Sequence, residues 1–284
     1  MGASVVRQLV PGRAMREGAG VTVRRTLGSS ALPNLDPFLM LDYFNSDDPN
    51  DYIAGFPEHP HRGFVTVTYM LDGHMLHQDS MGNRGDLGPG GVQWMKAASG
   101  VLHSEMPQQE AGLMRGFQIW INLPAREKMS APAYQEFTAA RLPTVRENGA
   151  EIKVIAGSHA GRTGPVSDPH TDACYLDVAL AAEYRFAHRA EADHQGFVYC
   201  FEGGLTIDGT ELPGHHLAVL DTSRLWSLTA DKSGARFIMV TGRPLGEPVA
   251  QYGPFVMNTR EEIEQALRDY RDGKLVRVKA GVIS

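Results

Sequence analysis

The feature that most constrains the fold of this 284-residue chain is an internal repeat of short strand-like segments. Three segments of the first half recur loosely in the second half, in the same order and with shorter loops between them. The pairs are Tyr69–Gly73 with Tyr199–Gly203, Gly88–Gly90 with Leu212–Gly214, and Gly116–Trp120 with Ala235–Met239. A long repeat built from β-type segments and turns predicts two successive β-barrels.

A connector separates the two predicted barrels at residues 123–150. Three prolines and several charges interrupt any strand pattern there, although the sequence is compatible with a short helix. We therefore expect one domain at residues 1–135 and a second at residues 136–284. The 31 glycines and 17 prolines suit a fold with many tight turns, and 42% hydrophobic residues suffice for two cores.

The end of the second domain predicts one short helix. Asn258 or Thr259 can cap its start, acidic residues follow in the first turn, and basic residues and Gly273 lie near its end. Four apolar residues recur at helical spacing, which is typical of a face packed against a barrel. These residues are Ile263, Ala266, Leu267 and Tyr270.

The first pair of candidate metal ligands lies in the first predicted barrel. His59 and His61 precede the apolar, β-branched run Phe64–Leu71. That run ends at the dipeptide Asp72-Gly73, which is typical of a tight hairpin turn. The two imidazoles are therefore expected to lead into a β-hairpin.

The second pair, His103 and Glu105, lies on another predicted strand, at residues 101–106. Side chains two apart on a strand point to the same face, so each pair can aim both ligands at one point in a barrel interior. A lone His-x-His is more often solvated than metal-bound, but two such pairs in strands favour a site. The sequence predicts one ion held by His59, His61, His103 and Glu105.

The second repeat lacks this ligand set. The step from Pro89 to His103 in the first copy leads from Pro213 to Ser227 in the second, where no imidazole or carboxylate stands. Three histidines remain in the second copy, but two of them are adjacent and would face opposite sides of a strand. They are His194, His215 and His216. We therefore expect a second barrel without metal ligands.

The segments around these ligands resemble the signature segments of the pirin family of cupins, over nearly the whole chain. Those segments are His59–Phe64, Gly82–Gly85, Gln93–Met95, Gly100–Met106 and Gly116–Pro124. A usual cupin places a glutamate shortly after its His-x-His, where this chain has Val65, Thr66 and Val67. Pirins are similar to this chain in supplying the carboxylate from the second motif, here Glu105.

The resemblance implies an all-β fold of two tandem cupin-type jelly-roll barrels with a short C-terminal helix. For some pirins it also implies quercetin 2,3-dioxygenase activity, which opens a flavonol ring and releases carbon monoxide. Fe(II) is then the expected ion, although the ligand types also suit Mn(II), Co(II), Ni(II) and Zn(II). Two free coordination positions would hold a flavonol-like substrate and dioxygen.

Glu105 has two alternative roles in such a site. It could accept the flavonol hydroxyl proton as a general base, or it could serve only as a ligand. Apolar residues beside the motifs are expected either to line a cleft for a flat aromatic ligand or to belong to the core. These residues are Phe38, Met40, Phe56, Trp94 and Met106.

A regulatory role is the main alternative to an enzyme. Pirins of nucleated cells are described as transcriptional co-regulators, so the chain could be a metal- and redox-dependent binding protein with a protein partner and no turnover. A cupin isomerase acting on sugars or keto acids is a third alternative, which fits the narrow pirin resemblance less well.

Charge and cysteine content limit the partners and the compartment. The formal net charge of −6 argues against direct binding of nucleic acid or of an anionic membrane. Cys174 and Cys200 are expected to be reduced thiols, with a disulfide left open. The first ten residues lack the apolar region of a signal peptide, which favours a soluble, cytoplasmic protein.

Overall fold

The computed structural model describes residues 4–277 and contains two compact units, each a β-barrel. Of the described residues, the first barrel comprises 14–25, 38–139 and 245–277. The second comprises residues 4–13, 26–37 and 140–244. The predicted all-β fold with a short C-terminal helix is confirmed. The compact units differ from the linear division expected at residue 135, because each terminal segment belongs to the barrel of the other half.

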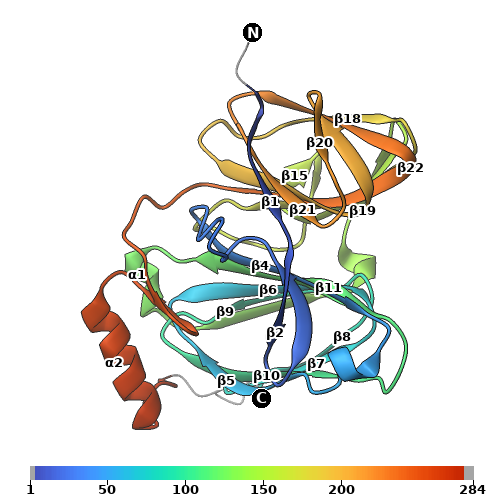
Figure 1. Ribbon diagram of the computed structural model, residues 1–284. Coiled ribbons are helices and arrows are strands. Elements are labelled where there is room, and N and C mark those ends of the chain that lie inside the picture. The colour runs from blue at the N-terminus through green and yellow to red at the C-terminus, as the bar shows by residue number, and fades with distance from the viewer. Residues whose placement is uncertain (1–3, 278–284) are drawn as a thin grey trace. The chain divides into compact units, whose positions relative to one another are not determined.

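The first barrel is formed by two sheets that lie in separate layers (Figure 1). The larger sheet has seven strands. In spatial order they are β12 (Ala133–Phe137), β9 (Val92–Lys96), β6 (Phe64–Asp72), β11 (Met114–Asn122), β4 (Phe38–Ser46), β3 (Val21–Arg25) and β2 (Arg13–Glu17). The smaller sheet has four. They are β5 (Phe56–His61), β10 (Val101–Pro107), β7 (Met75–Asp79) and β8 (Arg84–Leu87).

Strand β6 shows what its sequence predicted locally and what it did not. Its β-branched and aromatic residues form a strand in which Phe64 to Leu71 are all buried. The predicted hairpin at Asp72-Gly73 is wrong, because β6 pairs with β9 and β11 whereas β7 pairs with β8 and β10. Gly73 still turns the chain, at a φ of 83°, but the turn carries the chain from one sheet to the other.

The second barrel is formed by a nine-stranded sheet. Its path is β1 (Val6–Pro11), β21 (His216–Leu220), β19 (Gln195–Ile207), β22 (Leu225–Gly242), β17 (Cys174–Leu180), β14 (Ala150–Ala156) and β13 (Thr144–Glu147), with β18 (Arg185–Arg189) on β22 and β20 (Thr210–Leu212) on β19. The loop that follows β14 contains a short ribbon of β15 (Ser158–His159) and β16 (Arg162–Thr163).

The core of the second barrel is one hydrophobic cluster drawn from most of these strands. Trp226, Leu228, Phe237 and Phe186 are at most 3% exposed within it. Burial of one large apolar side chain contributes about 1.5–3 kcal/mol, so this cluster supplies much of the stability of the barrel.

The connector contains more regular structure than its prolines indicated. It forms α1 (Ala125–Lys128), whose start follows Pro124, and the short 3₁₀ turn η2 (Ala139–Arg141). Between them β12 joins the edge of the first barrel by pairing with β9. A second 3₁₀ turn, η1 (Pro49–Asp51), lies after β4.

The C-terminal helix α2 (Arg260–Arg271) is confirmed, with Thr259 as its N-cap and Glu262 completing a capping box. Ile263 and Ala266 are buried against Phe255 of β24 (Phe255–Met257), which pairs with β23 (Ala250–Tyr252). The other two residues of the predicted face are partly exposed, at 37% for Leu267 and 45% for Tyr270.

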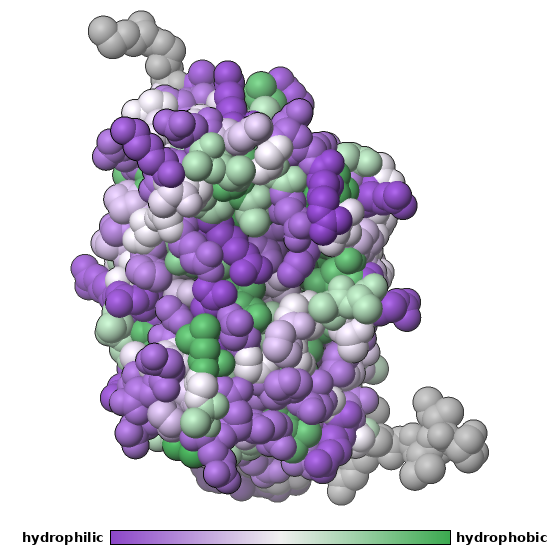
Figure 2. Space-filling view, turned by 90° about the vertical axis from the view of Figure 1, so that its right-hand side faces the viewer, coloured by the Kyte–Doolittle hydropathy of each residue, from purple (hydrophilic) through white to green (hydrophobic). Residues whose placement is uncertain are grey.

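The surface agrees with the charged composition of the chain. On the face shown in Figure 2, hydrophilic side chains predominate and apolar ones are scattered among them. Among the described residues, no helix combines the length and apolar character that crossing a membrane requires.

Candidate metal centre

The register of strands β5 and β10 brings the histidines of the two motifs together. His103 lies directly opposite His59, and Val101 lies opposite His61. The register shifts between His103 and Glu105, where Phe56 becomes the opposite residue. Residues opposite one another in antiparallel strands project to the same side, so two motifs about forty residues apart form one cluster.

The three imidazoles form a compact group. The Nε2 atoms of His59 and His61 are 3.1 Å apart, and the ring centroid of His103 lies 4.3 Å from that of His59 and 4.8 Å from that of His61. One nitrogen from each ring lies within 4.8 Å of the other two. Two nitrogens bound at right angles to an ion, each about 2.1 Å from it, would be about 3 Å apart, so the spacing fits a first coordination shell.

The electrostatic state of the group also fits a metal ion. His61 and His103 are at most 2% exposed, and burial is the main cause that lowers the pKa of each well below the usual value. Both rings are therefore neutral at pH 7, the form in which imidazole binds a metal. The Nε2 atom of His103 is buried without a hydrogen-bond partner, which an ion in the cluster would supply.

Glu105 lies beside this group rather than within it. Its side chain is 4% exposed, and its Oε1 lies 2.7 Å from the Thr68 hydroxyl. Gln118 Nε2 donates to its other oxygen at 3.5 Å. The carboxylate forms a second cluster of candidate ligand atoms with His103 and His77. The structure therefore brings Glu105 to His103, while the three imidazoles form their own group.

His77 is the residue of this region that the sequence analysis missed. It is fully buried on β7, two residues before Asp79, and its Nε2 lies 3.2 Å from the Asp79 carboxylate. The available signal was a third i, i+2 pair of ligand-type residues in a strand-like segment, with the same spacing as the two pairs that were identified.

Two buried basic side chains hold the segment that follows His61. Arg62 donates from Nε to Ser99 O at 2.6 Å and from Nη1 to Asp269 of α2 at 2.8 Å. Lys128 Nζ donates to the backbone oxygens of Gly63 and Val256 and to the Asn122 side chain, at 2.6 to 2.9 Å, and burial lowers the pKa of Lys128 to about 7. Buried donors with several good acceptors fix backbone positions, so the segment that follows His61 is held rigidly.

Several apolar residues beside the motifs belong to the buried interior. Phe38, Met40 and Trp94 are at most 6% exposed, whereas Phe56 and Met106 are partly exposed. Trp120, also partly exposed, lies edge-on to His61 with ring centroids 5.3 Å apart. Among the three clustered imidazoles, His59 is the one that reaches solvent.

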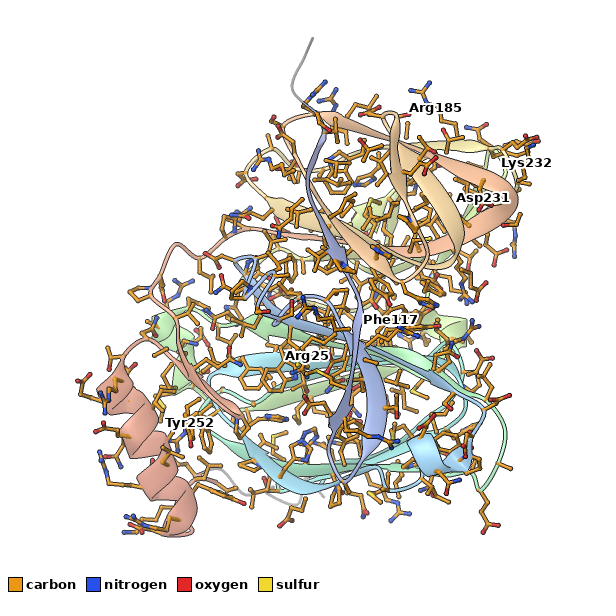
Figure 3. The ribbon with its side chains drawn as sticks, viewed as in Figure 1. Arg25, Phe117, Arg185, Asp231, Lys232 and Tyr252 are labelled. Carbon is orange, nitrogen blue, oxygen red and sulfur yellow. The ribbon has the colours of Figure 1, made fainter. Side chains whose placement is uncertain are left out.

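The second barrel has no equivalent cluster. Within residues 4–277, the groups of three or more converging ligand atoms are the two in the first barrel. Ser227, the counterpart of His103 by sequence counting, accepts a hydrogen bond from Arg185 at 2.6 Å, and Figure 3 places Arg185 at the edge of this barrel. His188 lies against Trp226, with ring centroids 6.0 Å apart, and burial lowers its pKa to about 4.

The two cysteines are free thiols. Cys200 is buried and Cys174 is partly buried. Burial raises the pKa of Cys174 to about 11 and that of Cys200 to about 12, so both are protonated and unreactive at neutral pH.

Comparison with protein families agrees with the repeated architecture and the ligand motifs. A family model described as Pirin matches residues 20–121, and one described as the Pirin C-terminal cupin domain matches residues 175–276. The chain belongs to the pirin family. Its two barrels are accordingly cupin barrels, the first of which carries the cluster of imidazoles.

Relatives of this pirin are similar over almost their whole length. It is 49% identical to a Pseudomonas aeruginosa protein named "Putative quercetin 2,3-dioxygenase", over 95% of this chain and 97% of the other. It is 47% identical to a pirin-like protein of Caulobacter vibrioides, over 95% and 98%. The solved structure of a quercetin 2,3-dioxygenase from Acinetobacter baumannii superposes with a TM-score of 0.89 at 32% identity, covering 96% of this chain and 99% of the other.

Proposed function

We propose that this pirin is a mononuclear metal-dependent dioxygenase that opens the ring of a flavonol or a similar aromatic compound. The observation that carries the proposal is the group of three imidazoles in the first barrel, in which His103 has a buried Nε2 without a hydrogen-bond partner. The Pseudomonas aeruginosa relative named "Putative quercetin 2,3-dioxygenase" and the Acinetobacter baumannii quercetin 2,3-dioxygenase support the substrate class.

The proposed ligands are His59, His61, His103 and Glu105, and the proposed ion is Fe(II). Such an ion would hold an organic substrate and dioxygen side by side and allow electron transfer between them. Rotation of the Glu105 side chain away from Thr68 would bring a carboxylate oxygen to the imidazoles, because His103 and Glu105 project from the same face of β10.

The residues of the chain have separate tasks in this proposal. The imidazoles bind as neutral ligands, and the Arg62 and Lys128 anchors hold them in place. Glu105 accepts the proton of the flavonol hydroxyl after it has left the position in which Thr68 and Gln118 bond to its carboxylate. Both oxygen atoms of dioxygen enter the ring-opened ester, and one ring carbon leaves as carbon monoxide.

Oxygen consumption with a flavonol tests the proposal directly. Metal-free protein would be loaded with Fe(II), Mn(II), Co(II) or Ni(II), mixed with quercetin, and followed with an oxygen electrode and by carbon monoxide detection. The proposal expects equal amounts of oxygen consumed and carbon monoxide released, above a control with free metal. A protein that binds metal but consumes no oxygen with any flavonol would instead support the regulatory alternative.

A further inference from the structure

Strand β7 brings a second polar pair to the strand that carries His103. In the register of β7 and β10, Asp79 lies opposite His103 and His77 lies opposite Glu105. The four side chains therefore share one face of two neighbouring strands. His103 belongs to both groups of candidate ligand atoms, so the role of its neighbour His77 needs an explanation.

With both imidazoles neutral, the hydrogen bonds of His77, Asp79 and His103 allow one arrangement of protons. Asp79 Oδ2 lies 3.2 Å from His77 Nε2, and a carboxylate only accepts, so that nitrogen carries the proton. His77 Nδ1 then holds a lone pair, and it lies 3.4 Å from His103 Nδ1, which must be the donor. The lone pair of His103 is thereby left on Nε2, the nitrogen that is buried without a partner.

Asp79 is itself held firmly. Its Oδ1 accepts from the backbone nitrogens of Met81 at 2.9 Å and Asn83 at 3.0 Å. Its Oδ2 also accepts from the Asn83 side chain at 2.8 Å. The turn between β7 and β8 therefore fixes the Asp79 carboxylate, which in turn fixes the orientation of the His77 ring.

The ring of His77 is held from one side by an aromatic contact. Its centroid lies 5.0 Å from that of Tyr134, whose hydroxyl bonds with Glu136 and Gln93. Gly85, opposite His77 on β8, leaves the room that this contact needs. A Cβ atom at position 85 would lie 1.7 Å from the Glu136 carboxylate and 2.5 Å from the Tyr134 hydroxyl.

We propose that His77 is a positioning residue for the metal centre, which with Asp79 fixes His103 as the Nδ1–H tautomer and directs the Nε2 lone pair into the imidazole cluster. The inference rests on the proposed metal centre. Both nitrogens of His77 are already engaged, so the second group of ligand atoms serves as support for the first and not as another ion site. Partners of this kind set the orientation and basicity of a metal-bound imidazole.

The tautomer can be measured without any metal. Long-range ¹H–¹⁵N correlation spectra of metal-free protein with labelled histidine should show wild-type His103 with its proton on Nδ1. His77→Phe keeps the aromatic contact but removes the acceptor, and should give a mixture of tautomers. His77→Gln, which can accept from His103 and donate to Asp79, should retain the wild-type signal.

Asp79→Asn provides a second variant, which is useful even if the protein does not fold with Phe in place of His77. An amide can donate to His77, which would move its proton to Nδ1 and force His103 to carry its own proton on Nε2. His159→Phe is the matched control, because His159 pairs with Glu147 at 2.9 Å in the second barrel. The control should leave the His103 signal unchanged.

Titration with Co(II) provides the second readout. His77→Phe should weaken binding by about 10- to 100-fold, as is usual when the partner of a metal-bound histidine is removed, and His77→Gln should restore most of the affinity. If His77→Phe changes neither the tautomer of His103 nor the affinity for Co(II), this inference is overturned while the proposed metal centre stands. Wild-type protein that binds two Co(II) ions, one of them lost in His77→Phe, would make His77 a ligand and also overturn it. Wild-type protein that binds no Co(II), Fe(II) or Ni(II) would overturn the proposed centre together with this inference.

Discussion

The two barrels use the same strand arrangement to hold different interiors. In the first barrel β10 lies between β5 and β7, and in the second the start of β22 lies between β18 and β19. On the three strands of the first barrel, His59, His103 and Asp79 lie opposite one another. On the three strands of the second barrel, the residues that lie opposite one another are Phe186, Leu228 and Ile207, which belong to one hydrophobic cluster.

This difference shows how a cluster of buried polar side chains affects the stability of a barrel. A buried apolar row contributes to stability by removing hydrocarbon from water, whereas buried imidazoles and carboxylates must be desolvated and then hydrogen-bonded. In the first barrel, hydrogen bonds to the carboxylates of Glu105 and Asp79 offset part of that cost. The apolar residues of the second barrel are therefore expected to contribute to stability and not to metal binding.

The largest expected effect tests whether the metal belongs to the first barrel alone. His61→Ala and His103→Ala should each reduce the bound metal from one ion per chain to almost none, because each removes one of three clustered imidazoles. Elemental analysis and circular dichroism would measure occupancy and folding. His216→Ala in the second barrel is the control and should keep the ion. Two tightly bound ions per wild-type chain would contradict the comparison.

The next effect concerns Glu105 and separates binding from turnover. Glu105→Gln should keep much of the metal, since three imidazoles remain, while flavonol turnover falls by roughly 10² to 10⁴ if a general base is lost. The rate per bound metal ion, measured at saturating metal, is the deciding quantity. Glu202→Gln, on β19 of the second barrel, is the matched control. An unchanged rate per metal ion would leave Glu105 as a ligand only.

A smaller effect is expected from a core substitution in the second barrel. Leu228→Ala should lower the free energy of unfolding by about 2–5 kcal/mol, because it leaves a cavity in the hydrophobic cluster. Metal affinity should stay within about twofold of wild type, since the cluster contains no ligand. Lys232→Met, at an exposed position marked in Figure 3, should change neither quantity. A parallel loss of metal would show that the two barrels do not divide stability and chemistry as proposed.

The smallest expected effect is a dependence of stability on pH in the metal-free protein. Buried histidines of both barrels contribute to it. Burial keeps His61 and His103 neutral in the folded chain, and it lowers the pKa of His188 to about 4. The unfolded chain binds protons at these residues below about pH 6.5, so stability should fall as the pH drops from 7.5 toward 5.

Chemical denaturation at several pH values would measure this dependence. His61→Asn and His188→Asn should each weaken it, one in each barrel. Added metal should steepen the dependence in the first barrel only, because protons compete with the ion for its ligands. If the effect of metal on the pH dependence disappears in His188→Asn and persists in His61→Asn, the ion binds in the second barrel, which contradicts the prediction.

Much of the fold could be predicted because its signals are local. The start of α2 was predicted with Asn258 or Thr259 as its cap, and the structure has Thr259 there, in a capping box with Glu262 three residues away. Strand β10 was likewise predicted, at residues 101–106, and the structure has it at Val101–Pro107. The predicted hairpin after β6 failed because a turn such as Asp72-Gly73 shows where a strand ends, but not which strand it pairs with.

Most residues of the candidate site could also be predicted from local patterns, and one could not. His59, His61, His103 and Glu105 were selected from spacing and motif, and the structure clusters the three imidazoles and brings Glu105 to His103. His77 was missed although it has the same two-residue spacing from Asp79, because its importance depends on β7 lying beside β10. No pattern along the chain states that register.

By itself, the sequence determined which residue types could bind an ion, where several strands lie, and that one repeat carries candidate ligands which the other lacks. Only the tertiary structure decided which sheet each strand joins, that residues 245–277 belong with the first barrel, and that His77 hydrogen-bonds to His103. The physical reason is the range of the interactions. Strand propensity, capping and i, i+2 geometry act within a few residues, whereas sheet pairing and tautomer choice depend on residues distant in sequence.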